Sequence, residues 1–198
     1  MNTLLQGELV RLVAANAEKD AELLARWSHD SEYARQLDSD PARPQSVKRA
    51  KEDIQKWMEN ESPDSFGFMI RTLADDRLIG FIGLDGIRWT HGDTFVGIGI
   101  GDPEYRGNGY GTDAMRVILG YGFLGLNLSR VTLTVFGYNE RAIKSYLKVG
   151  FKEEGRLRQW MLRDEKRDDL VYMGILRAEW ERMNPIPTWL AKTDGQPG

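Results

Sequence analysis

Residues 95–136 pass from a strand pattern to a helix pattern and back, and this succession leaves few folds open to the chain. A strand-like run at 95–100 is followed by a glycine-rich loop and then by apolar residues at helical spacing over 115–126. Apolar and polar residues then alternate over 131–136, as they do in a strand. Elements of these lengths predict a right-handed crossover, so the strands near Ile98 and Leu133 are expected to run parallel.

The rest of the chain predicts a sheet that is mostly antiparallel. Short turns at 74–76 and 91–93 separate strand-like runs and indicate a meander. The predicted strands, besides the two above, are 9–13, 66–73, 78–89, 151–161 and 169–176. The predicted helices are 16–27, 47–58 and 139–149, with a polar loop containing one helical turn at 28–44. The expected fold class is therefore α/β, of the α+β type, with a mixed and mostly antiparallel central sheet.

Length and composition fit a single folded domain. At 198 residues, with 41% hydrophobic and 29% charged residues, the chain can bury a substantial core. We expect one domain over residues 1–180 and a tail at 181–198 that contains prolines. Chain order is expected to loosen from Trp180 onward, although Trp189 could dock on the body of the protein or on a partner.

The charge and residue counts exclude several classes of protein. A net charge of −3 gives no electrostatic footprint for nucleic acid. The absence of cysteine and the presence of only two histidines argue against a disulfide framework and a metal site. No apolar stretch is long enough for a membrane helix, and residues 1–11 lack a signal-peptide pattern. We therefore expect a cytoplasmic protein with no metal and no nucleic-acid or membrane partner.

The loop at 102–112 is the best candidate for a functional site. Gly107, Gly109 and Gly111 let the backbone turn tightly and approach a ligand closely. Free amides at the start of the following helix favour an anion, and Arg106 adds a full positive charge. These features predict a binding site for a phosphate or pyrophosphate.

Two familiar phosphate motifs do not fit. The chain lacks the lysine of a P-loop. The letters Gly-x-Gly-x-x-Gly do occur at 120–125, but only four residues separate them from the next strand. A dinucleotide-binding βαβ unit needs a whole helix there, so these glycines are expected to allow close packing and to end the helix.

Two motifs in order resemble the GNAT N-acetyltransferases. The run Arg106-x-x-Gly109-x-Gly111 resembles the acetyl-CoA pyrophosphate loop of that family, Gln/Arg-x-x-Gly-x-Gly/Ala. The run at 139–151 is similar to the family pattern Asn-x-x-Ala-x-x-x-Tyr-x-x-x-Gly-Phe. The run at 78–83 is similar to the strand that enters the family's central sheet. The run at 153–158 and the closing strand resemble the branch of ribosomal-protein N-terminal and spermidine acetyltransferases. The resemblance spans roughly residues 8–180 and implies helices on both faces of the sheet.

The resemblance implies where acetyl-CoA binds. The parallel strands would splay apart, and the pantetheine amides would pair with the backbone of Ile98, Gly99 and Ile100, one of whose amides would also polarise the thioester carbonyl. The pyrophosphate would lie over the loop and the start of the helix. The residues implied there are Arg106, Gly107, Asn108, Gly109, Tyr110, Gly111 and Thr112.

Asn139 and Tyr146 lie two helical turns apart, so both can line one groove. Asn139 is a good N-cap for its own helix and is also implied as a contact of pantetheine. Tyr146 is either a packing residue or, as the resemblance implies, the general acid for the departing thiolate. A phenol can hydrogen-bond or protonate that sulfur as it leaves.

The general base is left open by the sequence. Phe95 stands where many relatives have glutamate, and Asp85, Asp93, Glu104 and His91 are the nearby alternatives. Asp30, Glu32, Asp38 and Asp40 could attract a cationic amine, although a solvated acidic loop is the favoured explanation for them.

The resemblance implies an acetyl-CoA-dependent N-acetyltransferase that acts on a primary amine by direct attack on the thioester. A protein N-terminal α-amine and a small polyamine or amino compound both remain open as acceptors, and so does a homodimer. Two other hypotheses stay in view: an acyl-CoA sensor without turnover, and a nucleotide-phosphate binder without acyl chemistry.

Overall fold

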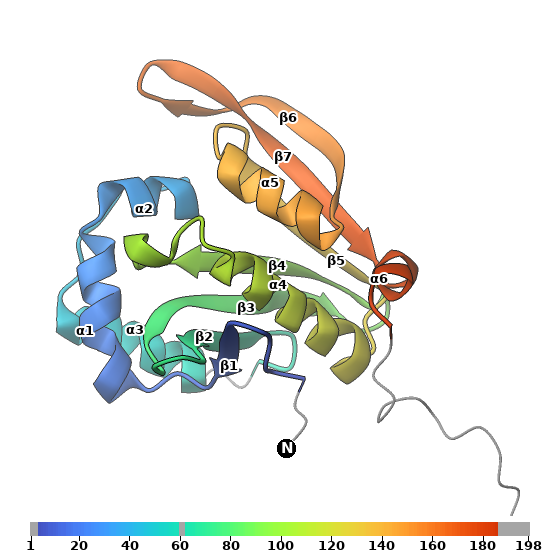
Figure 1. Ribbon diagram of the computed structural model, residues 1–198. Coiled ribbons are helices and arrows are strands. Elements are labelled where there is room, and N and C mark those ends of the chain that lie inside the picture. Colours follow the sequence, from blue (N-terminus) through green and yellow to red (C-terminus); the bar gives the residue numbers. More distant parts are fainter. Residues whose placement is uncertain (1–3, 60–61, 186–198) are drawn as a thin grey trace, which may run out of the picture.

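The computed structural model describes residues 4–59 and 62–185. Its centre is a seven-stranded sheet with the order β1-β2-β3-β4-β5-β7-β6 (Figure 1). The strands are β1 (Val10–Val13), β2 (Phe66–Thr72), β3 (Leu78–Arg88), β4 (Asp93–Ile100), β5 (Arg130–Phe136), β6 (Lys152–Arg163) and β7 (Lys166–Leu176). The helices are α1 (Ala17–Ser28), α2 (Ser31–Leu37), α3 (Val47–Glu59), α4 (Tyr110–Gly120), α5 (Glu140–Val149) and α6 (Arg177–Met183).

The predicted fold class is confirmed. Strands β1 to β4 pair antiparallel in chain order, as do β5 with β7 and β7 with β6. The pair β4–β5 is parallel, as the crossover predicts, but it is very short. It runs only from Asp93 opposite Arg130 to Phe95 opposite Thr132. Beyond that point the two central strands no longer pair.

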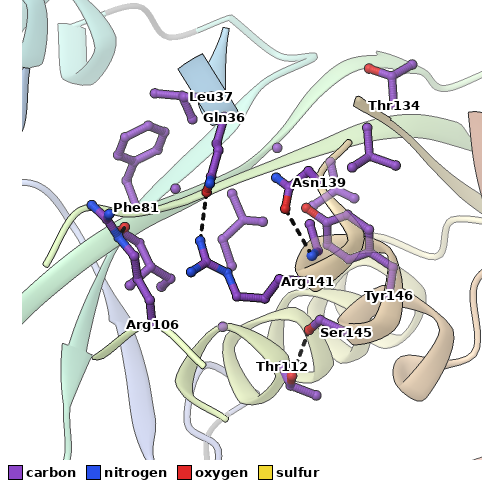
Figure 2. A pocket seen from close by; sticks show the side chains of 18 of the residues that line it. Gln36, Leu37, Phe81, Arg106, Thr112, Thr134, Asn139, Arg141, Ser145 and Tyr146 are labelled. Carbon is purple, nitrogen blue, oxygen red and sulfur yellow. Dashed lines mark hydrogen bonds between the residues drawn. The ribbon is translucent and has the colours of Figure 1, made fainter. Parts of the chain in front are cut away.

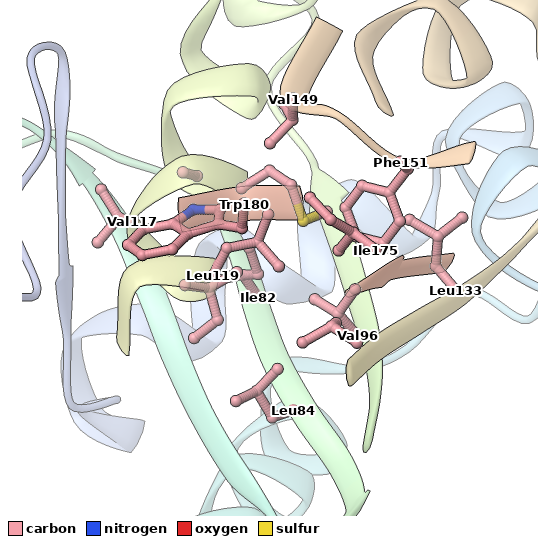
Figure 3. Close-up of a cluster of buried hydrophobic side chains, with 14 of the residues drawn as sticks. Ile82, Leu84, Val96, Val117, Leu119, Leu133, Val149, Phe151, Ile175 and Trp180 are labelled. Atoms are coloured by element: carbon pink, nitrogen blue, oxygen red, sulfur yellow. The ribbon is translucent and has the colours of Figure 1, made fainter. Parts of the chain in front are cut away.

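Each face of the sheet buries its own core because successive strand residues point to opposite sides. On one face, α4 and α6 pack on strand residues such as Ile82, Val131 and Ile175 (Figure 3). On the other face, alanines of α1 together with Ala50 and Ile54 of α3 meet Met69 and Leu78. Helices therefore cover both faces, as expected.

Short polar side chains fix where the helices begin. The side chain of Asn16 accepts a hydrogen bond from the amide of Lys19 and so caps α1. Asn139 caps α5 in the same way, through the amide of Ala142 at 3.2 Å. Helix α5 ends at Gly150, whose φ of 105° is the left-handed geometry that favours glycine.

A buried carboxylate ties the first strand to the crossover helix. Asp113, in the first turn of α4, accepts hydrogen bonds from the amides of Glu8, Leu9 and Val10 at 2.8–3.2 Å. It is 4% exposed, so these amides supply the partners that a buried charge requires. Asp113 thereby fixes the start of α4 relative to β1. The sequence analysis had not singled out this residue.

Two segments differ from the sequence expectation. Residues 31–37 form the helix α2, longer than the single turn expected, because Asp30 caps it through the amide of Tyr33. Residues 177–183 form α6, where we expected looser chain from Trp180 onward. The indole of Trp180 is 6% exposed and lies 5.5 Å from the ring of Phe123, which explains the order there. Trp189 lies outside the described residues.

The domain boundary predicted between residues 180 and 181 falls inside α6 and stays a prediction. The glycine-rich run expected to end the crossover helix begins at Gly120, the last residue of α4, and continues as a wide helical turn over Tyr121–Gly125. Within residues 4–59 and 62–185, no helix is long and apolar enough to cross a membrane.

Candidate active site

The unpaired ends of β4 and β5 open into a large cavity. Immediately past the last paired residues, Val96–Ile100 of one strand and Thr134–Phe136 of the other line it. Its volume is about 1090 Å³, above the range of about 300–1,000 Å³ typical of a site for one small ligand. The cavity therefore has room for two substrates that meet between the strands.

The glycine-rich loop forms one end of this cavity. Gly107 and Gly109 have φ values of 82° and 90°, a conformation that L side chains rarely adopt. Helix α4 begins directly after Gly109 and has no side-chain cap, so the first amides of the helix are left to an external acceptor. Gly107, Gly109, Gly111 and Thr112 line the cavity. This geometry suits an anion such as a pyrophosphate.

Arg106 lies in the loop as expected, but its charge is already used inside the protein. Its guanidinium donates to the carbonyls of Ile100 and Gly101 at 2.9 and 2.7 Å and pairs with Asp30 at 3.0 Å. It also lies over the ring of Tyr33 and is only 8% exposed. We therefore find Arg106 acting as a brace between the loop and α2, not as a free cation at the rim.

Other cations face the cavity from α5. Arg141, Lys144 and Lys148 recur at helical spacing on one face and line it. Arg141 donates to the side chain of Gln36 across the cavity at 2.7 Å (Figure 2). We did not predict these residues as part of the site, although their spacing of three and four residues was a readable signal.

Asn139 and Tyr146 both line the cavity, as their spacing predicted (Figure 2). Burial raises the pKa of the Tyr146 hydroxyl to about 12, so this phenol stays neutral across the physiological range. Among the described residues its hydroxyl has no hydrogen-bond partner, and its ring packs near Phe151. The preceding residue, Ser145, contacts Thr112 at 2.7 Å and joins α5 to α4.

The candidate bases differ in how free they are. The guanidinium of Arg88 grips Asp93 and lowers the pKa of that carboxyl. Glu104 and His91 are exposed and do not line the cavity, whereas Asp85 does. Phe95 is 48% exposed and is the last residue of β4 that pairs with β5.

Strand β4 contributes no carboxylate to the lining of the cavity, since Asp93 lies outside it and pairs with Arg88. Phe95, Gly97 and Gly99 alternate on one face of the strand, and Tyr33 and Leu37 of α2 lie over Gly99. The acidic residues expected to attract a cationic amine lie elsewhere: Asp30 pairs with Arg106, and Asp38 and Asp40 are exposed outside the cavity. In the part of the chain that the structure describes, no cluster of side chains could hold a metal ion.

The comparison with known proteins agrees with this geometry. The model of the acetyltransferase (GNAT) domain matches residues 10–152. This chain belongs to the GNAT acetyltransferase family. The match covers the sheet from β1 to β5, the glycine-rich loop and α5.

Curated relatives carry acetyltransferase names. The chain is 30% identical over 138 residues to "Putative ribosomal N-acetyltransferase YdaF" of Bacillus subtilis, which covers 70% of this chain and 75% of that protein. It is 36% identical over 93 residues to a spermidine N(1)-acetyltransferase of Escherichia coli, which covers 46% of this chain and 50% of the relative. The GNAT enzyme described here is therefore an N-acetyltransferase that uses acetyl-CoA as acetyl donor.

Solved structures show the same fold. A probable acetyltransferase superposes with a TM-score of 0.77 at 26% identity, covering 87% of this chain and 96% of the other. The Vibrio cholerae spermidine N-acetyltransferase in complex with CoA and spermine gives a TM-score of 0.75 at 23% identity, over 88% and 98% of the two chains. At that identity the second likeness concerns the fold alone.

Proposed function

We propose that this GNAT enzyme acetylates the N-terminal α-amine of a protein or peptide in preference to a polyamine. The observation that carries the proposal is the charge of the cavity wall. Three cationic side chains of α5 line it, Arg141, Lys144 and Lys148, against two carboxylates, Asp85 and Glu140, while the charge of Arg106 is paired with Asp30. Glu140 is moreover paired with Lys144 at 3.0 Å. A polycation gains little in such a site, whereas an acceptor with a single amine loses little.

The protonation of the acceptor supports the same choice. An α-amine has a pKa of about 7.7–8.0, so about a quarter of it is neutral at about pH 7.4. A lysine-like amine, with a pKa of about 10.4, is neutral to only about one part in a thousand there. An enzyme with Phe95 in place of a glutamate, and with no carboxylate of β4 among the residues that line the cavity, is therefore better suited to an α-amine.

We assign the acetyl-CoA contacts as follows. The free amides at 107–112 hold the pyrophosphate, and the unpaired backbone of Ile98, Gly99 and Ile100 pairs with the pantetheine arm. Asn139 lies beside that arm while capping α5. The phosphate charge is matched by Lys144, Lys148 and Arg141, because Arg106 is engaged with Asp30.

The proposed reaction is direct attack. The nitrogen of the neutral amine forms a bond to the thioester carbon, the carbon–sulfur bond breaks, and CoA leaves as the thiolate. The nitrogen loses its proton to water, and the sulfur gains one. Since burial keeps the Tyr146 hydroxyl neutral, that hydroxyl supports the departing sulfur by donating a hydrogen bond.

The test is a panel of acceptors with release of free CoA thiol as the readout. Peptides with a free N-terminus should be acetylated with kcat/KM at least about 10-fold above spermidine. The same peptides with a blocked N-terminus and an internal lysine are the matched control and should be inactive. Preference for spermidine would overturn the proposed acceptor, and binding of acetyl-CoA without thiol release from any amine would show a sensor instead. Mass analysis of the peptide product locates the acetyl group.

A further inference from the structure

A buried tyrosine hydroxyl beside the cavity lacks a partner. Within residues 4–59 and 62–185, two buried side-chain polar atoms have no hydrogen-bond partner, the Nε1 of Trp27 and the hydroxyl of Tyr33. Tyr33 is 8% exposed and belongs to the residues that line the cavity, whereas Trp27 does not. An unpaired buried hydroxyl costs stability, so its presence calls for an explanation.

The hydroxyl lies over the acceptor face of β4. A Cβ placed on Gly99 would be 2.6 Å from the Tyr33 oxygen, 3.1 Å from Phe81 and 3.2 Å from Leu37. Two residues earlier on the same face, a Cβ on Gly97 would meet no atom within 4 Å. Open space over Gly97 therefore adjoins a small enclosure over Gly99, and of the three side chains nearest to Gly99 only Tyr33 brings a polar atom.

The surroundings hold this side chain in place without using the hydroxyl. The guanidinium of Arg106 lies 5.2 Å from the centre of the Tyr33 ring, and the ring of Trp27 meets it edge-on at 6.5 Å. Asp30 accepts a hydrogen bond from the Tyr33 amide at 3.1 Å and binds Arg106. A phenylalanine would keep all of these contacts. Packing therefore accounts for the ring and leaves the oxygen unexplained.

Helix α2 is also fixed from its other end. Arg163, on β6, donates to the carbonyl of Asp38 at 3.0 Å and to that of Arg35, and the hydroxyl of Tyr138 donates to the same Arg35 carbonyl. These contacts satisfy carbonyls at the end of the helix. Both ends of α2 are thus tied to neighbouring elements, one to the glycine-rich loop through Arg106 and one to β6 through Arg163. Leu37, 41% exposed, forms the outer wall of the enclosure.

We propose that the Tyr33 hydroxyl binds the acceptor, its oxygen accepting a hydrogen bond from an N–H of the amine that enters over Gly97. Entry requires the exposed side chain of Leu37 to turn aside, and the amine then supplies the partner that the hydroxyl lacks. Burial raises the pKa of Tyr33, so the group is neutral and orients the amine without taking its proton. The proposal rests on amine acetylation by this site and deepens it by naming a residue that contacts the acceptor.

The test replaces Tyr33 with phenylalanine. Y33F should lower kcat/KM for the acceptor about 10- to 100-fold, the loss expected for one hydrogen bond to an amine, and should leave acetyl-CoA affinity unchanged. Its melting temperature should stay level or rise, because the variant removes an unpaired buried hydroxyl. A purely structural tyrosine would give the opposite pair of results. An unchanged kcat/KM would overturn the proposal, and so would an equal loss of acetyl-CoA affinity.

Tyr121→Phe is the matched control. Tyr121 is another partly buried tyrosine with edge-on aromatic neighbours, Phe66 and Phe68, and it does not line the cavity. Y121F should acetylate like the unaltered enzyme. The measurement uses whichever amine the unaltered enzyme accepts best. If that amine is spermidine, the proposed preference for α-amines fails while the role of Tyr33 is still tested.

Discussion

At the scale of single residues, position in a motif did not decide what a side chain does. Arg106 occupies the first position of the glycine-rich motif, and we expected its charge to face a phosphate. The folded chain instead surrounds it with two backbone carbonyls, Asp30 and the ring of Tyr33. The loop thus depends on its amides for anion binding, while Arg106 links the loop to the helix over the acceptor side.

For Tyr146, the position in the motif implies a general acid, and burial of the side chain narrows how its hydroxyl can act. Full proton transfer from a phenol of pKa about 12 to a thiolate of pKa about 8.5 is uphill by about 5 kcal/mol. Hydrogen-bond donation carries no such penalty. Burial therefore favours donation of a hydrogen bond by this hydroxyl over full transfer of its proton.

Tyr146→Phe should lower kcat about 10- to 100-fold and change the KM for acetyl-CoA less than threefold, because the lost hydrogen bond matters most as the sulfur leaves. Steady-state kinetics at saturating acceptor measures both. An unchanged kcat would remove the role.

The raised pKa of Tyr146 also adds stability that is fully present below pH 10 and is lost as pH rises from about 10 to about 12. Unfolding of Y146F should lack this alkaline component.

At the scale of elements, the start of α4 and the helix α2 form opposite walls of one site. Asp113 fixes the first through the amides of residues 8–10, and Arg106 with Arg163 fixes the second. Their separation depends on where the β4–β5 ladder stops, which is at Phe95 and Thr132. The short ladder is therefore what creates space for a thioester between two paired strands.

Gly109→Val should abolish measurable acetyl-CoA binding in calorimetry. A branched side chain fills the approach to the free amides and cannot relax into a φ of 90°. The same strain should cost about 1–2 kcal/mol of folding free energy, so binding must be measured well below the melting temperature. Gly155→Ala is the control, since a Cβ there meets no atom within 4 Å and no positive φ is required. Normal affinity in G109V would refute the loop assignment.

At the scale of the whole molecule, the last helix completes the core instead of beginning a tail. Trp180 packs on Phe123 and belongs to the same buried cluster as Val149 and Ile175 (Figure 3). This cluster lies behind α4 and α5, so it supports the two helices that line the cavity. Whether the enzyme forms a homodimer stays a prediction.

Trp180→Ala should lower the free energy of unfolding by about 3–5 kcal/mol, the usual cost of truncating a buried aromatic residue. Chemical denaturation followed by circular dichroism measures it. Leu162→Ala, at a side chain that is 60% exposed, is the control and should change stability by less than about 0.5 kcal/mol. A loss below about 1 kcal/mol in W180A would show that the packing of Trp180 on Phe123 contributes little to the stability of the fold.

The sequence by itself determined the order of the strands and helices, the parallel crossover and the place of the glycine-rich loop. These depend on local periodicity and on glycines that permit a positive φ, and both can be read along the chain. The full length of α2 and the last helix were not predicted. Asp30 caps α2 locally and is itself held by the distant Arg106, and the distant Phe123 packs against Trp180.

Only the tertiary structure decided which groups the site residues contact. It turned Arg106 inward and placed the hydroxyl of Tyr33 over Gly99. Each outcome depends on which buried polar groups find partners, and those partners lie tens of residues away in the chain. Hydrogen bonding between segments leaves no periodic trace in a sequence, and for that reason only the folded chain could show it.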